Sequence, residues 1–363
     1  MKNIYGNHIT LTLFGESHGE AIGAVLDGIA PGIDVNEDFI RHQLSLRRPS
    51  GDISTQRREA DIFSIKSGVV SGKTTGTPIC IIIENNNKQS KDYSAIDGKA
   101  RPGHADFAAF QKYHGFEDRR GGGHFSGRIT AALVAACAIV IYALKEKGIN
   151  VATHIQKCAG VYDRNFENLA DDIATLNNKI FPVLSDEAGE KMQTEILKAK
   201  SELDSVGGVL ETVITGVPSG IGEPWFDTVE SLISHGLFSI PAVKGVQFGD
   251  GFNLADMRGS CANDCFALNG DKTVTVTNHN GGINGGITNG MPIVFSCVIK
   301  PTPSIAKEQA TVDFIKGEEV KLSIEGRHDP CIVHRARVVV DSIAAFTVAD
   351  ILVGRYGTDY LKD

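Results

Sequence analysis

The sequence has little that would place it in a membrane or outside the cell. Its longest uninterrupted apolar run, from Ile129 to Leu144, is rich in alanine and shorter than the roughly 20 residues that cross a bilayer. The first residues lack the apolar core of a secretory signal. We therefore expect a cytoplasmic protein without a membrane partner, in which this run forms a helix buried on all sides.

The sequence also lacks the cysteine pattern of a disulfide-bonded or zinc-binding protein. The seven cysteines are odd in number and scattered through apolar segments, which is typical of a reducing compartment rather than of a disulfide framework. Only Cys261 and Cys265 lie close together, and no second pair stands at the spacing of a zinc site. We expect no metal.

Basic charge is in deficit, with 36 Lys and Arg against 44 Asp and Glu and a formal net charge of −8. This deficit argues against nucleic acid as a partner. The arginines nevertheless come in tight pairs among glycines and polar residues: Arg47 with Arg48, Arg57 with Arg58, Arg119 with Arg120, and Arg335 with Arg337. Because guanidinium groups bind carboxylates and phosphates in bidentate fashion, the clusters indicate a small polyanionic ligand.

Glycine is abundant, at 40 residues, but shows no repeat, and no linker divides the chain. Alternating and β-branched segments predict strands over 9–13, 24–27, 63–70, 78–84, 210–217 and 242–248. Helical spacing predicts helices over 106–113, 126–147, 185–203, 228–238 and 336–353. These elements fit a single α+β domain over residues 1–363.

The segment Gly15-Glu16-Ser17-His18-Gly19 matches the G-x-S-x-G pattern of a nucleophile elbow. An elbow leads into a helix, whereas the residues after Gly19 are interrupted by glycine and proline and favour a strand. The Ser71–Thr75 segment does not form a phosphate-binding loop, because Ser67 stands where that motif needs glycine and a strand follows.

Five loops rich in histidine, arginine, glycine or proline remain, at 14–19, 100–106, 120–128, 300–304 and 325–331. Any one of them alone is more simply explained as a capped turn with an exposed histidine. Together they are typical of a site built from loops on a rigid scaffold.

In chain order, GESHG, RRPSG, STQRREAD, DYSAI, RPGHAD, RGGGHFSGR, GVPSGIGEP, AVKGVQFGDGF, NHNGGINGGITNG, KPTPSI and GRHDPC resemble the motifs of chorismate synthase over nearly the whole chain. The resemblance implies a β-α-β sandwich with core helices between antiparallel sheets, assembled as a homotetramer. It implies 1,4-anti-elimination of phosphate from 5-enolpyruvylshikimate 3-phosphate to give chorismate. Reduced FMN (FMNH2) is required without net redox change, and NADPH is a candidate reductant for it.

The resemblance also implies roles for individual residues. His18 matches the residue that assists the leaving phosphate, His104 the second histidine near the flavin, and Asp329 the carboxylate that faces flavin N5. Ser17 and Ser126 match polar residues that hydrogen-bond within the site. The candidates for binding substrate are Arg47, Arg48, Arg128 and Arg335. The candidates for binding the cofactor are His124, Phe125, Ser126, Pro241, Ala242, Gly285, Lys300, Pro301, Thr302, Pro303, Ser304 and Arg327.

Two alternatives stay open. A flavin- or phosphate-binding regulatory protein would need the arginines but not the set His18, His104 and Asp329. A serine hydrolase would use Ser17 as its nucleophile. We further expect Arg101 to bias His104 toward its neutral form and Arg327 to keep Asp329 ionised. Whether the chain reduces its own flavin or depends on an external reductant is not decided by the sequence.

Overall fold

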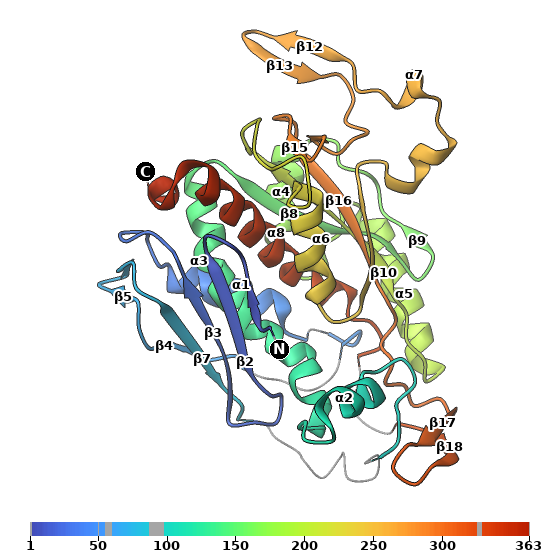
Figure 1. Cartoon of the computed structure of the whole chain (residues 1–363). Coiled ribbons are helices and arrows are strands. Elements are labelled where there is room, and N and C mark those ends of the chain that lie inside the picture. The colour runs from blue at the N-terminus through green and yellow to red at the C-terminus, as the bar shows by residue number, and fades with distance from the viewer. Residues whose placement is uncertain (1, 50, 55–59, 87–97, 325–328, 363) are drawn as a thin grey trace.

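The computed structural model describes residues 2–49, 51–54, 60–86, 98–324 and 329–362 (Figure 1). Its long helices lie between two antiparallel five-stranded sheets, with strand orders β1-β2-β3-β7-β4 and β11-β16-β10-β8-β9. This arrangement confirms the predicted α+β sandwich with core helices between antiparallel sheets.

The strands of the first sheet are β1 (Ile4–Tyr5), β2 (Thr10–Gly15), β3 (Ala21–Asp27), β4 (Phe63–Ile65) and β7 (Ile79–Glu84). Those of the second are β8 (Asn150–Cys158), β9 (Val161–Tyr162), β10 (Gly208–Thr215), β11 (Val243–Phe248) and β16 (Ile293–Ile299). Two-stranded ribbons pair β5 (Val69–Val70) with β6 (Lys73–Thr74), β12 (Phe266–Asn269) with β13 (Lys272–Thr275), β14 (Ile283–Asn284) with β15 (Ile287–Thr288), and β17 (Gln309–Asp313) with β18 (Glu318–Leu322).

The α-helices are α1 (Glu37–Arg47), α2 (Asp106–Tyr113), α3 (Thr130–Glu146), α4 (Leu169–Leu176), α5 (Asp186–Ser201), α6 (Val229–Ser239), α7 (Gly259–Ala262) and α8 (Val333–Tyr356). Short 3-10 turns at Arg120–Phe125 and Gly127–Ile129 lead into α3.

Helices α3 and α8 form the centre of the sandwich. Helix α3 packs against β2, β3 and β7 on one side and against α8 on the other, and α8 in turn packs on β8 and β10. A helix that is apolar all round must be buried on all sides. The segment Gly127–Glu146 is long and apolar enough to span a membrane, but 83% of its apolar window is buried inside the fold. It is a core helix, as predicted.

Two carboxylates of α8 attach this helix to other parts of the fold, one to the N-terminal segment and one to β8. The buried Asp350 carboxylate accepts backbone N–H bonds from Asn7, His8 and Ile9 at 2.9, 2.6 and 2.9 Å. These bonds fix the loop that enters β2. Asp341 lies 3.0 Å from Arg337 and accepts a 2.6 Å bond from Thr153, which ties α8 to β8.

Most predicted elements are present, with ends displaced by a few residues. The single strand predicted over 63–70 is wrong: β4 ends at Ile65, and Gly68, with φ of +79°, turns the chain before β5. The predicted helix over 126–147 begins late, because Ser126 caps a 3-10 turn and the α-helix starts at Thr130. Elements that no prediction named include α1, β8 and β16.

One histidine of the second sheet is buried between carboxylates. His154 Nδ1 lies 2.9 Å from Asp163 Oδ2, and Nε2 lies 2.9 Å from Glu211 Oε2. Burial by itself lowers the pKa of His154, but the bonds and charges of Asp163 and Glu211 outweigh burial and raise the pKa. The two carboxylates therefore favour the charged form of His154 in the folded protein.

We expect His154→Gln to lower the free energy of unfolding more at pH 6 than at pH 9. A raised folded-state pKa gives stability that is full below the unfolded value of about 6.5 and is lost as pH rises through the folded value. The loss at pH 6 should be roughly 1.5–3 kcal/mol, the size of a hydrogen bond to a charged group. Urea unfolding at both pH values measures it, and equal losses at the two would contradict the assignment.

Candidate active site

Three consecutive glycines organise the loops at one end of the sandwich. Gly121, Gly122 and Gly123 have φ values of 62, 87 and 52°, in the left-handed region that favours glycine. Gly123 O accepts a 3.1 Å bond from Ser17 N, and the next residue, His124, donates from Nδ1 to Gly15 O at 2.8 Å. The glycine loop is thus bonded to the loop between β2 and β3.

The backbone of this loop lies directly against both predicted catalytic histidines. A Cβ at Gly121 would lie 2.2 Å from His18 Cε1 and 2.7 Å from Ser17 Oγ. A Cβ at Gly122 would lie 3.2 Å from His104 Nε2. The structure therefore brings His18, His104 and Ser17 together from separate segments.

His18 is 3% exposed, and one of its nitrogens is held by the protein. Its Nδ1 lies 2.9 Å from Ser17 Oγ, which in turn lies 3.2 Å from Arg120 O. Because a carbonyl only accepts, the Ser17 hydroxyl donates to Arg120 and can accept from His18 Nδ1–H.

The G-x-S-x-G segment is not a nucleophile elbow. The chain continues from it into β3 and not into a helix, as the glycines and proline predicted. Ser17 itself is 1% exposed and its hydroxyl is engaged by its neighbours. This geometry supports a hydrogen-bonding role for Ser17 beside His18.

His104 lies on the loop that enters α2, and two cofactor candidates reach the same loop. The ammonium of Lys300 donates to Gly103 O, and Lys300 N bonds Ala242 O at 3.0 Å. A Cβ at Gly103 would lie 3.5 Å from Pro303 Cβ. Burial, with a smaller effect of the Lys244 charge, lowers the pKa of Lys300.

Two predicted substrate arginines share a buried carboxylate. Arg47 Nη1 lies 3.3 Å from Asp61 Oδ2, and Arg128 Nη1 contacts Asp61 Oδ1. Arg128 Nε also donates to Asn85 Oδ1 at 3.0 Å, while Asn85 Nδ2 donates to Glu16 O and Gly19 O at 3.0 and 3.1 Å. The arginine network is therefore attached to the loop that carries His18.

The other two substrate arginines adjoin this network. Arg335 Nε donates to Arg47 O at 2.9 Å, and its Nη1 contacts Asp329. Arg48 Nη2 donates to Ala60 O, whereas Arg48 Nε is buried and has no hydrogen-bond partner within the described residues. Among the described residues, these four arginines gather around two carboxylates, Asp61 and Asp329, and a cluster of guanidinium groups suits an anionic ligand.

Most of the remaining candidates lie near the loops already described, and Gly285 lies away from them. Ser126 Oγ accepts from Arg128 N at 3.2 Å, Phe125 is 39% exposed beside the Tyr113 ring, and Thr302 Oγ1 is buried without a partner in the described part of the chain. Ser304 is buried, and Pro241 and Pro301 adjoin Ala242 and Lys300. Gly285 lies between β14 and β15, at the end of the molecule opposite α2 (Figure 1). Arg327 lies outside the described residues.

Sequence reasoning missed three side chains that bond to the predicted site residues. Asp61 bonds Arg47 and Arg128, Asn85 bonds Arg128, and Asp106 bonds His104. Asp61 and Asp106 end the segments STQRREAD and RPGHAD, so the motifs contained them. Their partners are set by tertiary contacts, so a local pattern does not identify them. Asp329 pairs with Arg335 in the structure, and Arg327, the partner that the sequence suggested, lies outside the described residues.

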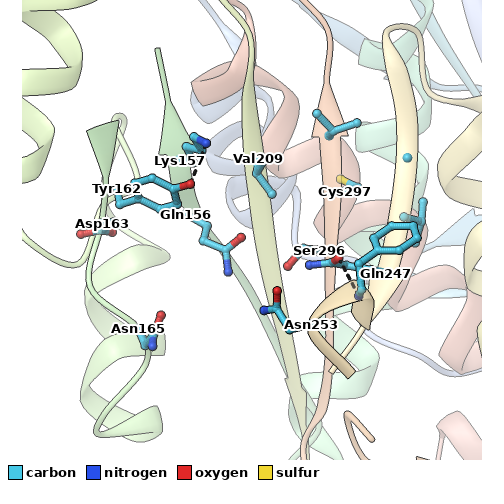
Figure 2. A pocket seen from close by; sticks show the side chains of 14 residues that line it. Gln156, Lys157, Tyr162, Asp163, Asn165, Val209, Gln247, Asn253, Ser296 and Cys297 are labelled. Atoms are coloured by element: carbon cyan, nitrogen blue, oxygen red, sulfur yellow. Dashed lines mark hydrogen bonds between the residues drawn. The ribbon is translucent and has the colours of Figure 1, made fainter. Parts of the chain in front are cut away.

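A separate cavity of about 430 Å³ lies on the second sheet (Figure 2). Its lining includes Gln156, Asn165, Gln247 and Ser296, and Lys157 donates to Tyr162 Oη at 2.7 Å beside it. None of the predicted site residues lines this cavity. The histidines and arginines therefore form a different site.

The buried His18 and the partly buried His104 lie against a glycine loop, and this pair, beside a cluster of four arginines, defines an enzyme site for an anionic substrate. Comparison with known proteins agrees. The family model described as chorismate synthase matches residues 9–353. The chorismate synthase of Lachnoclostridium phytofermentans is 46% identical over 362 residues, 99% of this chain and 97% of that protein. That of Thermococcus kodakarensis is 44% identical over 350 residues, 96% and 97% of the two chains.

A solved structure described as the crystal structure of chorismate synthase has a TM-score of 0.76 and 29% identity, covering 98% of this chain and 95% of that one. This chain belongs to the chorismate synthase family. Members of the family are lyases of the shikimate pathway that act on a phosphate ester.

We expect Gly121→Ala to lower turnover by at least about 10²-fold, because the new Cβ displaces His18 and Ser17 from their positions. Gly160→Ala is the matched control. Gly160 also has a positive φ, of 86°, but a Cβ there meets nothing within 4 Å. Both variants carry similar backbone strain, so similar melting temperatures with unequal turnover identify the contact as the cause. Equal turnover of the two variants would show that the Gly121 contact is not needed.

Proposed function

We propose that this chain catalyses the family's reaction, 1,4-anti-elimination of phosphate from 5-enolpyruvylshikimate 3-phosphate to give chorismate, at the site around Gly121–Gly123. The observation that carries this proposal is the cluster of Arg47, Arg48, Arg128 and Arg335, which Asn85 connects to the loop of the buried His18. We assign residues to each of three tasks: binding the substrate, supplying protons and binding the cofactor.

The arginines bind the substrate, which carries one phosphate and two carboxylates. Arg47 and Arg128 are oriented by Asp61, so their guanidinium groups lose little freedom when an anion binds. Within the described residues no group bonds Arg48 Nε, and Arg335 is held by Asp329 and the Arg47 carbonyl. Pre-ordered donors of this kind favour an anion in a site with little water.

His18 assists the departure of phosphate. Its Nδ1 is bonded to Ser17 Oγ, and we assign to Nε2 the proton or hydrogen bond that reaches the leaving oxygen. Burial of the ring excludes water from that transfer. His104 and Asp329 hold the other protons of the cycle. Ser126 positions Arg128, because the Ser126 hydroxyl accepts a bond from the backbone N–H of Arg128.

The loops beside His104 fit a ligand that combines a phosphate with a flat ring. Thr302 Oγ1 is a buried hydroxyl with no partner among the described residues, Lys300 supplies a cation, and Phe125 exposes ring surface. Residues 124–126, 241–242 and 300–304 would hold reduced FMN, with Arg327 as a further candidate. When bound, reduced FMN lends electron density to the substrate and regains it within one cycle. NADPH is a candidate source of its electrons.

We further propose a single domain that assembles as a homotetramer in the cytoplasm. The main hydrophobic core draws residues from Ile9 to Leu361, beside a small second cluster around Ala152 and Val213, which supports a single domain. The β12–β13 ribbon extends from the body (Figure 1) and exposes Phe266 and Leu268, as expected of a surface that packs on another copy. All seven cysteines lie in the described residues as free thiols, which suits the cytoplasm.

Anaerobic incubation of the purified chain with 5-enolpyruvylshikimate 3-phosphate, FMN and dithionite tests the reaction. We expect chorismate and phosphate in equal amounts while the flavin stays reduced. Binding of both ligands without product would favour the regulatory protein instead. Labelling of Ser17 by a fluorophosphonate would favour the hydrolase.

We expect Arg48→Ala to weaken binding of the substrate by about tenfold or more, with a much smaller effect on FMN. Each charge-assisted hydrogen bond to an anion is worth roughly 1.5–3 kcal/mol. Arg41→Ala is the control, since Arg41 belongs to the same helix and forms exposed pairs with Glu37 and Asp38 at 2.5 and 2.7 Å. Titration calorimetry measures both ligands, and equal losses for the two would remove Arg48 from the substrate site.

A further inference from the structure

A carboxylate on the first residue of α2 contacts both His104 and Arg101. Asp106 Oδ1 lies 2.7 Å from His104 Nδ1 and 2.7 Å from Arg101 Nη2, and Asp106 Oδ2 lies 2.8 Å from Arg101 Nε. The side chains of Arg101, His104 and Asp106 are 5, 17 and 16% exposed. The three groups form a compact cluster that is largely shielded from water.

The chemistry of the two partners decides which nitrogen of His104 carries the proton. Nδ1 also lies 3.1 Å from Arg101 Nη2. A guanidinium group can only donate, and an ionised carboxylate can only accept. Nδ1 therefore either donates to Asp106 or accepts from Arg101, and these two choices are opposite tautomers of the neutral ring.

The shorter contact selects the first choice. An unprotonated Nδ1 would face the Asp106 oxygen at 2.7 Å without a hydrogen between them, which is repulsive, whereas Nδ1–H makes a charge-assisted bond there. Burial by itself raises the pKa of Asp106, but hydrogen bonds from Arg101 and His104 outweigh burial and hold the pKa well below its usual value. The carboxylate is thus available as an acceptor at neutral pH.

The opposite edge of the ring lies at the glycine loop. Nε2 would be 3.2 Å from a Cβ at Gly122, so this nitrogen faces the glycine loop, on the edge of the ring opposite Asp106. The ammonium of Lys300 also lies at the His104 loop, where Gly103 O accepts from it. Nε2 is therefore the atom that exchanges protons or hydrogen bonds with a bound ligand.

We propose that Asp106 is a positioning residue for His104: it fixes the Nδ1–H tautomer and thereby presents Nε2 as an acceptor toward the site. Arg101 holds the Asp106 carboxylate in place through two parallel bonds. This inference rests on the proposed function only in that His104 takes part in the reaction.

The direct test is nitrogen-15 NMR of the ligand-free protein labelled in histidine, with the His104 signals assigned by their loss in His104→Gln. In the parent at high pH we expect a protonated Nδ1 and an unprotonated Nε2. In Asp106→Ala only Arg101 remains beside Nδ1, so the proton should move to Nε2. Asp250→Ala is the matched control: it removes the carboxylate 2.5 Å from His279 Nδ1 and should leave the His104 signals unchanged.

Kinetics separate positioning from a purely structural role. Asp106→Ala should lower kcat by about 10²-fold, at the low end of the effect of a positioned acid–base group, and change the KM for substrate by less than about threefold. A parent enzyme with Nε2–H, or a variant that keeps the parental tautomer and kcat, overturns the inference. If the parent forms no chorismate, the proposed function fails, but the tautomer of its His104 still tests this inference. The tautomer of the parent also tests it if Asp106→Ala does not fold.

Discussion

The left-handed path of Gly121–Gly123 is the constraint on which the site depends. Only a residue without Cβ lets the backbone touch the His18 ring on one side and the His104 ring on the other. The same loop bonds Ser17 and leads through Ser126 into α3, the central helix of the sandwich. Site geometry and core packing are therefore joined at this loop.

Charge is the second constraint. Burying Arg47 and Arg128 costs desolvation energy, which their bonds to Asp61 and to neutral acceptors offset in part. Asp61 contacts both guanidinium groups, and Asn85 connects Arg128 to the loop that carries His18. A cluster of arginines of this kind is favourable when an anionic ligand completes the site.

Much of the sandwich could be predicted from local pattern. The apolar run of α3, the capped surface helix α5 and the strand after Gly19 follow from periodicity and from breakers within a few residues. Strand β8 was missed because its alternation is interrupted by His154, whose partners Asp163 and Glu211 come from other segments. The strand predicted over 63–70 was wrong because Gly68 turns the chain.

The residues of the site were predicted from motifs, but the bonds between them were not. The pairing of Asp329 with Arg335, the sharing of Asp61 by two arginines and the contact of Asp106 with His104 all depend on how the loops meet in space. Sequence names the residues in such a cluster, whereas the choice of partner is set by the fold.

A crystal structure of the chain with bound 5-enolpyruvylshikimate 3-phosphate tests most directly whether these loops form one substrate site. We predict that the bound substrate contacts His18 together with at least one of Arg47, Arg48, Arg128 and Arg335 in the same subunit, with Gly121–Gly123 still in the left-handed path. Substrate bound in the cavity beside Gln156 and Gln247, or away from His18, would contradict this assignment.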